Sequence, residues 1–138
     1  MTLNTILFDL GGVLLRTENR TPRANLAARY NMTYQELSDY VYRQKSAHQA
    51  TLGEISAGDH WKVIAEDLGL TPEELRQFKD AFWGGDIMDD FLVDFIRGLR
   101  PFYTTGLLSN AWDDLREALT RQWKVIDAFD HIFISSEL

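Results

Sequence analysis

The sequence predicts an α/β fold in which a helical module is inserted into a parallel sheet. Three short apolar runs, at residues 3–9, 103–109 and 131–135, are typical of buried strands. A predicted helix over residues 112–122 separates the last two runs, and a strand, helix, strand unit of this length implies parallel pairing. The long segment between the first two strands has the start signals and the periodicity of helices.

The first strand contains the continuous apolar run Ile6-Leu7-Phe8 and is followed by Asp9 and by the pair Gly11-Gly12. Such a run is typical of a central parallel strand, and the glycine pair ends it. An aspartate at the carboxyl end of a strand lies where open α/β sheets bind ligands. We therefore interpret Asp9 as a candidate site residue.

Helix start signals recur through the middle of the chain. Thr21-Pro22 predicts an N-cap followed by a proline at the first helical position. Capping boxes are predicted at Thr33–Glu36 and Ser56–Asp59, and a third at Thr71–Glu74 combines with a proline at the first helical position. An apolar stripe from Met88 to Leu99 predicts a further helix.

This order of elements divides the chain into two predicted domains. An incomplete α/β core comprises residues 1–15 and 91–138, and a helical cap comprises residues 16–90. A module inserted there stands over the carboxyl ends of the strands. The second strand ends in Leu107-Leu108-Ser109-Asn110, and neighbouring parallel strands end side by side. We therefore expect Asp9 and Ser109 to face one pocket.

These residue types suit the transfer of an anionic group. An ionised aspartate is a competent nucleophile toward phosphorus or carbon. Its attack on a phosphate monoester brings two negative charges together, so the site needs a cation, for which Mg²⁺ with oxygen ligands is natural. The Ser109 hydroxyl, the N–H groups at a helix start and a glycine turn that lets the backbone approach could hold the phosphoryl oxygens.

Together these segments resemble the haloacid dehalogenase (HAD) superfamily, in the phosphatase-like subgroup that has a helical cap after its first motif. The resemblance covers essentially the whole chain and is carried by FDLGGVL, LGEIS, LGLTPEEL, DFIRGLRPFYTTGLLSNA and FDHIFISSEL. It implies a Rossmann-like parallel sheet and a Mg²⁺-dependent hydrolase that acts on small phosphate esters through an aspartyl-phosphate. By this resemblance Asp9 is the nucleophile and a metal ligand, and Gly11 ligates the metal through its backbone carbonyl. Gly12, Ser109 and Asn110 are expected to bind the phosphoryl group.

Two departures from the family pattern affect this expectation. Gly11 stands where most family phosphatases have a second aspartate, and general acid help of that kind is worth about 10²–10⁴-fold in rate. The motif III lysine and motif IV acids would follow the third strand, but the chain ends at Leu138, and Lys124 does not fit the motif III position. We therefore expect a truncated part that is inactive alone. Its first strand would expose an apolar edge through which two copies could pair as a homodimer.

Two alternative functions stay open. A metal-independent 2-haloacid dehalogenase would use Asp9 on a carbon–halogen bond and would need no acid at Gly11. The family's dehalogenases usually carry Tyr-Gly-Thr after the nucleophile, whereas this chain has Leu-Gly-Gly. The chain could instead be a non-catalytic remnant that self-associates.

Composition excludes several other classes of function. The net charge of −7 argues against nucleic acid and anionic membrane as partners. The absence of cysteine excludes disulfides and thiolate chemistry. The apolar stretches are too short to span a membrane, so a cytoplasmic protein is expected.

Other polar and aromatic residues are expected to be ordinary. Arg16, Arg20 and Arg23 are predicted to form a solvated basic stretch, and the four aspartates between residues 86 and 94 to form the solvated face of a helix. The three histidines share no ligand spacing, and Trp112 is expected to pack in the core.

Overall fold

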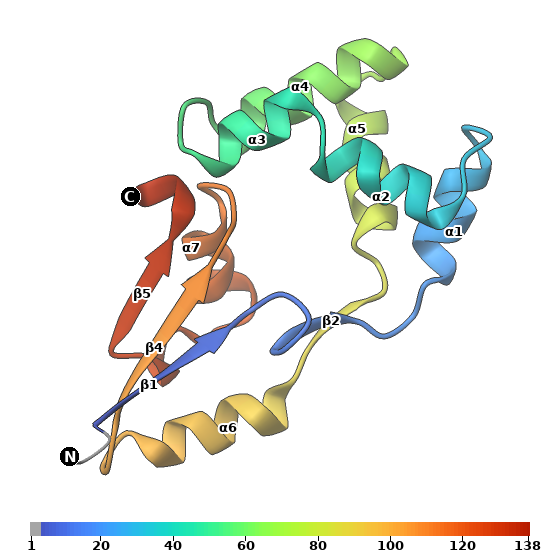
Figure 1. The fold of residues 1–138 in the computed structure, drawn as a ribbon. Helices are drawn as coiled ribbons and strands as arrows, with labels where there is room; N and C mark the ends of the chain where they lie inside the picture. The colour runs from blue at the N-terminus through green and yellow to red at the C-terminus, as the bar shows by residue number, and fades with distance from the viewer. Residues whose placement is uncertain (1–3) are drawn as a thin grey trace.

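The computed structural model describes residues 4–138 and confirms an α/β fold with a parallel sheet (Figure 1). The elements follow in the order β1 Thr5–Asp9, β2 Leu15–Thr17, α1 Thr21–Ala28, α2 Tyr34–Tyr42, α3 Lys45–Thr51, α4 Ala57–Leu68, α5 Pro72–Phe82, β3 Asp86–Met88, α6 Asp90–Leu99, β4 Thr104–Ser109, α7 Leu115–Glu117, η1 Ala118–Gln122, η2 Ile126–Ala128, β5 His131–Ile134 and η3 Ser135–Glu137. The three predicted strands correspond to β1, β4 and β5, and Leu3 lies outside the described residues.

The parallel sheet has the order β1-β4-β5, with Asp9 paired to Leu108 and Ser109 paired to Ile134. Within the described residues β1 has a neighbour on one side, so its other edge is free. Leu7 lies so close to Gly106 that a Cβ atom there would collide with the Leu7 side chain. The glycine therefore lets the two strands pair with this leucine folded across the sheet.

The two faces of the sheet differ sharply in burial. Side chains alternate along a strand, so one face carries Thr105, Leu107 and Ile134, which are at most 1 % exposed. Leu107 and Ile134 belong to a core closed by α6 and by the segment that follows β4. The opposite face carries Leu7, Leu108 and Phe133, which are 55 %, 51 % and 41 % exposed. The sheet therefore packs on one side and leaves an apolar face open on the other.

Helices α1 to α5 form a separate unit with its own core (Figure 1). The three capping boxes predicted at Thr33, Ser56 and Thr71 are confirmed. The cap predicted at Thr21 is wrong, because Arg20 occupies the N-cap and Thr21 is already helical. The Thr21 N–H donates a hydrogen bond to the Asn19 side-chain oxygen at 3.0 Å.

The prediction that Arg16, Arg20 and Arg23 are solvated is wrong for Arg23, which is 5 % exposed within the helical unit. Its Nε donates to the Phe82 carbonyl at 2.9 Å, and its guanidinium lies 3.9 Å from the centre of the Phe82 ring. Its Nη2 lies 3.5 Å from Asp86 Oδ1. These bonds compensate the cost of burying the charge.

Two short antiparallel strands, β2 and β3, link the helical unit to the sheet, and the sequence analysis did not predict them. The close approach of Asn19 requires a glycine at Gly85, because a Cβ there would collide with its backbone. Asp86 belongs to β3 and receives a hydrogen bond from Thr17 at 2.6 Å, so its assignment to a helix face is wrong. Strand β2 spans the predicted border between residues 15 and 16, and the domain borders stay a prediction.

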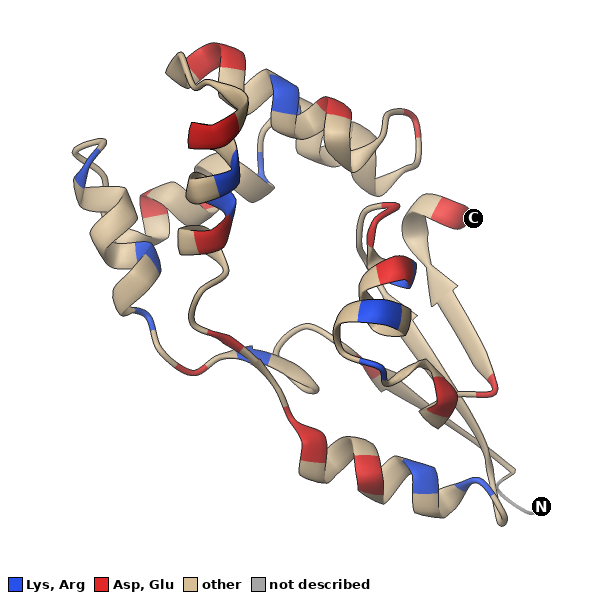
Figure 2. Cartoon of the chain, turned by 180° about the vertical axis from the view of Figure 1, so that it is seen from behind, with Lys and Arg blue, Asp and Glu red and all other residues tan. Residues whose placement is uncertain are grey.

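Helix α6 begins later than its apolar stripe predicted. Met88 ends β3, and Asp89 caps the helix by accepting the Leu92 N–H at 2.9 Å. Phe91 and Phe95, expected in the buried stripe, are 86 % and 56 % exposed, whereas Val93 and Ile96 are buried. Figure 2 shows acidic residues at the start of α6 and basic residues at its end, which suits the helix dipole.

The helix predicted over residues 112–122 is shorter and irregular. It begins at Leu115 and continues after one turn as a π-helix over Ala118–Gln122. Asp113, in the loop before this helix, accepts the Ala57 N–H at the start of α4 at 2.8 Å. The carboxylate therefore ties the sheet unit to the helical unit.

No helix among residues 4–138 is both long enough and apolar enough to cross a membrane.

Candidate active site

The site is built from the last residues of two neighbouring strands. Asp9 ends β1 and Ser109 ends β4, and the two strands are paired along their length. By strand alternation their side chains would project to opposite faces. Because both residues stand at the edge where the strands end, both line the same pocket. The expectation that they share a pocket therefore agrees with the geometry.

The turn after β1 presents the Asp9 carboxylate to this pocket. One of its oxygens, Oδ1, accepts the Leu10 N–H at 2.8 Å, and the residue stays exposed. The Leu10 carbonyl accepts the N–H groups of Val13, Leu14 and Leu15 at 3.2, 2.9 and 2.9 Å, which closes a tight turn. Asp9 therefore lines the pocket from a hydrogen-bonded turn.

The two glycines of this turn lie in different places. Gly11 lines the pocket, and a Cβ atom there would meet nothing within 4 Å. Gly12 is not among the lining residues, and its φ of 78° is the left-handed conformation that favours glycine. Gly12 therefore serves the turn, and its predicted contact with a phosphoryl group stays a prediction.

Ser109 and Asn110 both line the pocket from the end of β4. Ser109 is 7 % exposed. The loop that follows is fixed by Ser135, whose hydroxyl accepts the Ala111 N–H at 3.0 Å and donates to the Ala111 carbonyl at 3.1 Å. The two residues predicted to bind phosphate thus line the same pocket as Asp9.

Aromatic residues supply the wall opposite the strand ends. Tyr42 and Trp83 come from the helical unit, and Trp112 follows β4 but packs into the core of the helices. The Trp83 indole N–H donates to the Tyr42 hydroxyl at 3.1 Å, and the Tyr42 and Trp112 rings lie 5.8 Å apart. The pocket that they close has a volume of about 610 Å³. Trp112 therefore both packs and lines the pocket.

Sequence reasoning missed several lining residues, namely Tyr42, Thr51, Trp83, Asp86, Asp114, Gln122 and Trp123. Tyr42, Thr51 and Trp83 come from the helical unit and reach the pocket by packing between the two units, which no local pattern reports. Asp114 was within reach of prediction, because it lies in the loop that follows the second strand end.

The predicted cofactor is Mg²⁺, held by Asp9 and the Gly11 carbonyl. Carboxylate and carbonyl oxygens are the donors that Mg²⁺ prefers, and it commonly keeps several waters beside one or two carboxylates. Among residues 4–138 no group of three acidic or histidine side chains could complete a cage. The chain's own residues thus fit part of a magnesium site.

Lysine and arginine are absent from the lining of this pocket within the described residues. Lys124 lies outside the pocket lining, on the crossover between β4 and β5, where its carbonyl accepts from Arg97 at 3.0 Å. This placement agrees with the expectation that it does not take the motif III role.

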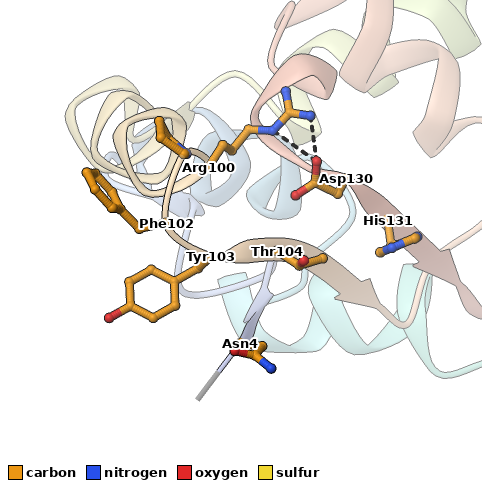
Figure 3. Close-up of a pocket in the computed structure, with 8 residues that line it drawn as sticks. Asn4, Arg100, Phe102, Tyr103, Thr104, Asp130 and His131 are labelled. Atoms are coloured by element: carbon orange, nitrogen blue, oxygen red, sulfur yellow. Dashed lines mark hydrogen bonds and ion pairs between the residues drawn. The ribbon is translucent and has the colours of Figure 1, made fainter. Parts of the chain in front are cut away.

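A second hollow lies at the opposite edge of the sheet, where β4 and β5 begin (Figure 3). There Arg100 pairs with Asp130 at 2.6 Å, and Asp130 also accepts the Thr105 N–H at 2.8 Å. The guanidinium and the carboxylate therefore satisfy each other. This hollow has no nucleophile comparable to Asp9.

Comparison with known proteins gives matches by structure. No protein-family model matches the sequence, and no curated protein sequence matches it significantly. A HAD family enzyme of Bacteroides thetaiotaomicron in complex with magnesium and inorganic phosphate is similar at a TM-score of 0.74 and 22 % identity, over 99 % of this chain and 70 % of its own. A predicted HAD-like hydrolase of Porphyromonas gingivalis matches at 0.68 and 20 %, over 98 % and 67 %. The L-2-haloacid dehalogenase of Xanthobacter autotrophicus matches at 0.52 and 23 %, over 96 % and 57 %.

These matches show that the chain has the HAD-type fold, including the helical insert. The match to the Bacteroides enzyme extends over nearly the whole chain, and the remainder of that enzyme has no counterpart in these 138 residues.

Proposed function

We propose that the chain carries the nucleophile and phosphoryl-binding part of a Mg²⁺-dependent HAD-type phosphohydrolase. The observation that carries this proposal is the meeting of Asp9, Gly11 and Ser109 in one pocket at the ends of neighbouring strands. The similar Bacteroides enzyme was crystallised with magnesium and inorganic phosphate, which supports phosphorus as the attacked atom.

In the first step the free Asp9 carboxylate oxygen attacks phosphorus. A bond forms between that oxygen and phosphorus, and the bond from phosphorus to the ester oxygen breaks. The Ser109 hydroxyl donates a hydrogen bond to a phosphoryl oxygen. The leaving alkoxide takes its proton from water, because Gly11 has no side chain to supply one. Water then attacks the aspartyl-phosphate, which releases inorganic phosphate and regenerates the carboxylate.

Magnesium, held in part by Asp9 and the Gly11 carbonyl, would offset the charge between the carboxylate and the phosphoryl group. The described residues supply no lysine at the pocket and an incomplete metal cage. We therefore propose that the 138 residues alone transfer a phosphoryl group to Asp9 slowly and turn over esters poorly.

The covalent step provides the test. The chain is incubated with Mg²⁺ and acetyl phosphate, quenched in acid and examined by intact-mass and peptide mass spectrometry. We expect a phosphoryl group on Asp9 that requires Mg²⁺ and is lost in Asp9→Asn. The matched control is Asp94→Asn, an exposed acid on α6. Labelling that is equal in wild type and Asp9→Asn would refute the proposal, and a Mg²⁺-independent ester formed with a 2-haloacid would favour the dehalogenase.

A substitution at Gly11 provides a second test, of whether the absence of a general acid slows the phosphorylation of Asp9. Its Cβ position is open, so Gly11→Asp should fold without collision. A carboxylic acid there would protonate a poor leaving group, and we expect about 10²-fold faster phosphorylation of Asp9 by an alkyl phosphate. Acetyl phosphate, whose leaving group needs no proton, should react at an unchanged rate. Equal acceleration with both donors would show that the aspartate acts otherwise.

A further inference from the structure

The charged residues that line the active-site pocket all have the same sign. Asp9, Asp86 and Asp114 line it, with no lysine or arginine among the described lining residues. Asp86 and Asp114 remain among the lining residues once Asp9 and any metal have engaged the phosphoryl group. An anionic leaving group would be repelled there.

The two remaining carboxylates are not equivalent. Asp86 already accepts from Thr17 at 2.6 Å and lies 3.5 Å from Arg23 Nη2. Asp114 lies beside a second acid, Asp113, whose repulsion acts on it more strongly than the attraction of Lys79. Burial, followed by repulsion from Asp113, raises the pKa of Asp114. An incoming cation would therefore stabilise Asp114 more than Asp86.

The aromatic side chains that line the pocket also suit a cationic ligand. The hydrogen bond from Trp83 to Tyr42 fixes two of its rings, and Trp112 is held in the helical core at 8 % exposure. Burial raises the pKa of the Tyr42 phenol, so the ring stays neutral at physiological pH. Rigid aromatic faces beside carboxylates attract organic ammonium ions through the electrostatic field of the rings.

We infer that the substrate's leaving group carries an organic ammonium ion, so that the substrate class is the phosphomonoester of an amino alcohol. This inference rests on the proposed phosphohydrolase function. The phosphoryl end would lie at Asp9 and Ser109, and the ammonium end near Asp114, Trp83 and Trp112. An ammonium group also withdraws electrons from the alkoxide that leaves, which lessens the need for the acid that Gly11 lacks.

The test compares two ligands of the same shape. Choline is titrated into the 138-residue chain and into its Asp9→Asn variant, alongside its neutral isostere 3,3-dimethylbutan-1-ol, with binding measured by calorimetry and by tryptophan fluorescence. We expect choline to bind about tenfold more tightly than the isostere, the size expected for a desolvated ammonium on an aromatic face. Equal binding of the two ligands, or no binding of choline, would overturn the inference.

Variants locate the binding site. Asp114→Asn and Trp83→Leu should each weaken choline binding several-fold and leave the isostere unchanged, whereas the control Asp94→Asn should bind both like wild type. Choline binding that survives both pocket variants would also overturn the inference. Because binding of the amine does not need the nucleophile, Asp9→Asn should retain it. In the wild-type chain, choline binding without any phosphorylation of Asp9 would refute the phosphohydrolase proposal, whereas phosphorylation of Asp9 without preferential choline binding would refute the substrate class alone.

Discussion

The helical unit and the sheet unit bury their apolar surfaces to different degrees. In the helices Trp61 and Phe82 are at most 2 % exposed, and even the charged Arg23 and the polar His60 are enclosed. The sheet covers one face, and it exposes Leu7, Leu108 and Phe133 on the other, together with the free edge of β1. The helices therefore complete a core with one tryptophan from the sheet unit, Trp112, whereas the sheet has apolar surface left to cover. The candidate site lies between a closed unit and an open one.

The strongest way to break this comparison is to remove one phenylalanine from each unit. Phe82→Ala should lower the free energy of unfolding by about 3–5 kcal/mol, because its ring is fully buried. Phe91→Ala on α6 should change it by less than about 0.5 kcal/mol, because its ring is 86 % exposed. Urea unfolding followed by circular dichroism measures both. Similar losses in the two variants would contradict the difference in packing.

A second contrast is between buried and exposed ion pairs. Arg23→Met should cost about 3 kcal/mol, since it leaves the Phe82 carbonyl and the poorly exposed Asp86 without their partner. Arg76→Met, which breaks exposed pairs with Glu73 and Asp80, should cost less than about 1 kcal/mol. The same urea titrations give both values, and an equal cost would show that Arg23 is better solvated than described.

These contrasts indicate what the sequence could predict. Local signals predicted the three strands of the sheet, three capping boxes and the nucleophile turn, because each depends on neighbouring residues. They failed for β2 and β3, which are three residues each and form by pairing across the helical insert. They failed for Arg23 because its partners lie 59 and 63 residues away. The aromatic wall of the pocket depends on the same long-range packing.

The stability of the protein should depend on pH through a buried histidine of the helical unit, His60. Burial lowers the pKa of His60, whose Nδ1 lies 2.7 Å from Ser46 Oγ and whose Nε2 lies 2.9 Å from the Val41 carbonyl. The unfolded chain therefore binds the proton more readily, with a pKa near about 6.5, so stability is complete above that pH and falls as the pH drops below it. We expect the urea midpoint to fall as the pH drops from 7 to 5.

His60→Gln should flatten this part of the pH profile. The exposed His131 offers the matched control, and His131→Gln should keep the wild-type slope. A slope that persists in His60→Gln would assign the titration to another group.

The smallest expected change in folding stability comes from a substitution on the exposed face of the sheet. Two copies pairing through β1 would cover apolar surface, and Leu7→Lys should abolish such pairing with little change in the unfolding midpoint. Leu52→Lys, at 49 % exposure on the helical unit, should leave association unchanged. Sedimentation velocity over a range of concentrations reports the result. A wild-type chain that stays monomeric would show that the open face is not used by a second copy.

The central claim is that the ends of β1 and β4 hold one phosphoryl group between them. Beryllium trifluoride mimics a phosphoryl group on a carboxylate, and fluorine NMR detects it when bound. With Mg²⁺ present we predict a bound signal in the wild-type chain, a weaker one in Ser109→Ala and none in Asp9→Asn. A bound signal that is unchanged in Asp9→Asn would contradict the account.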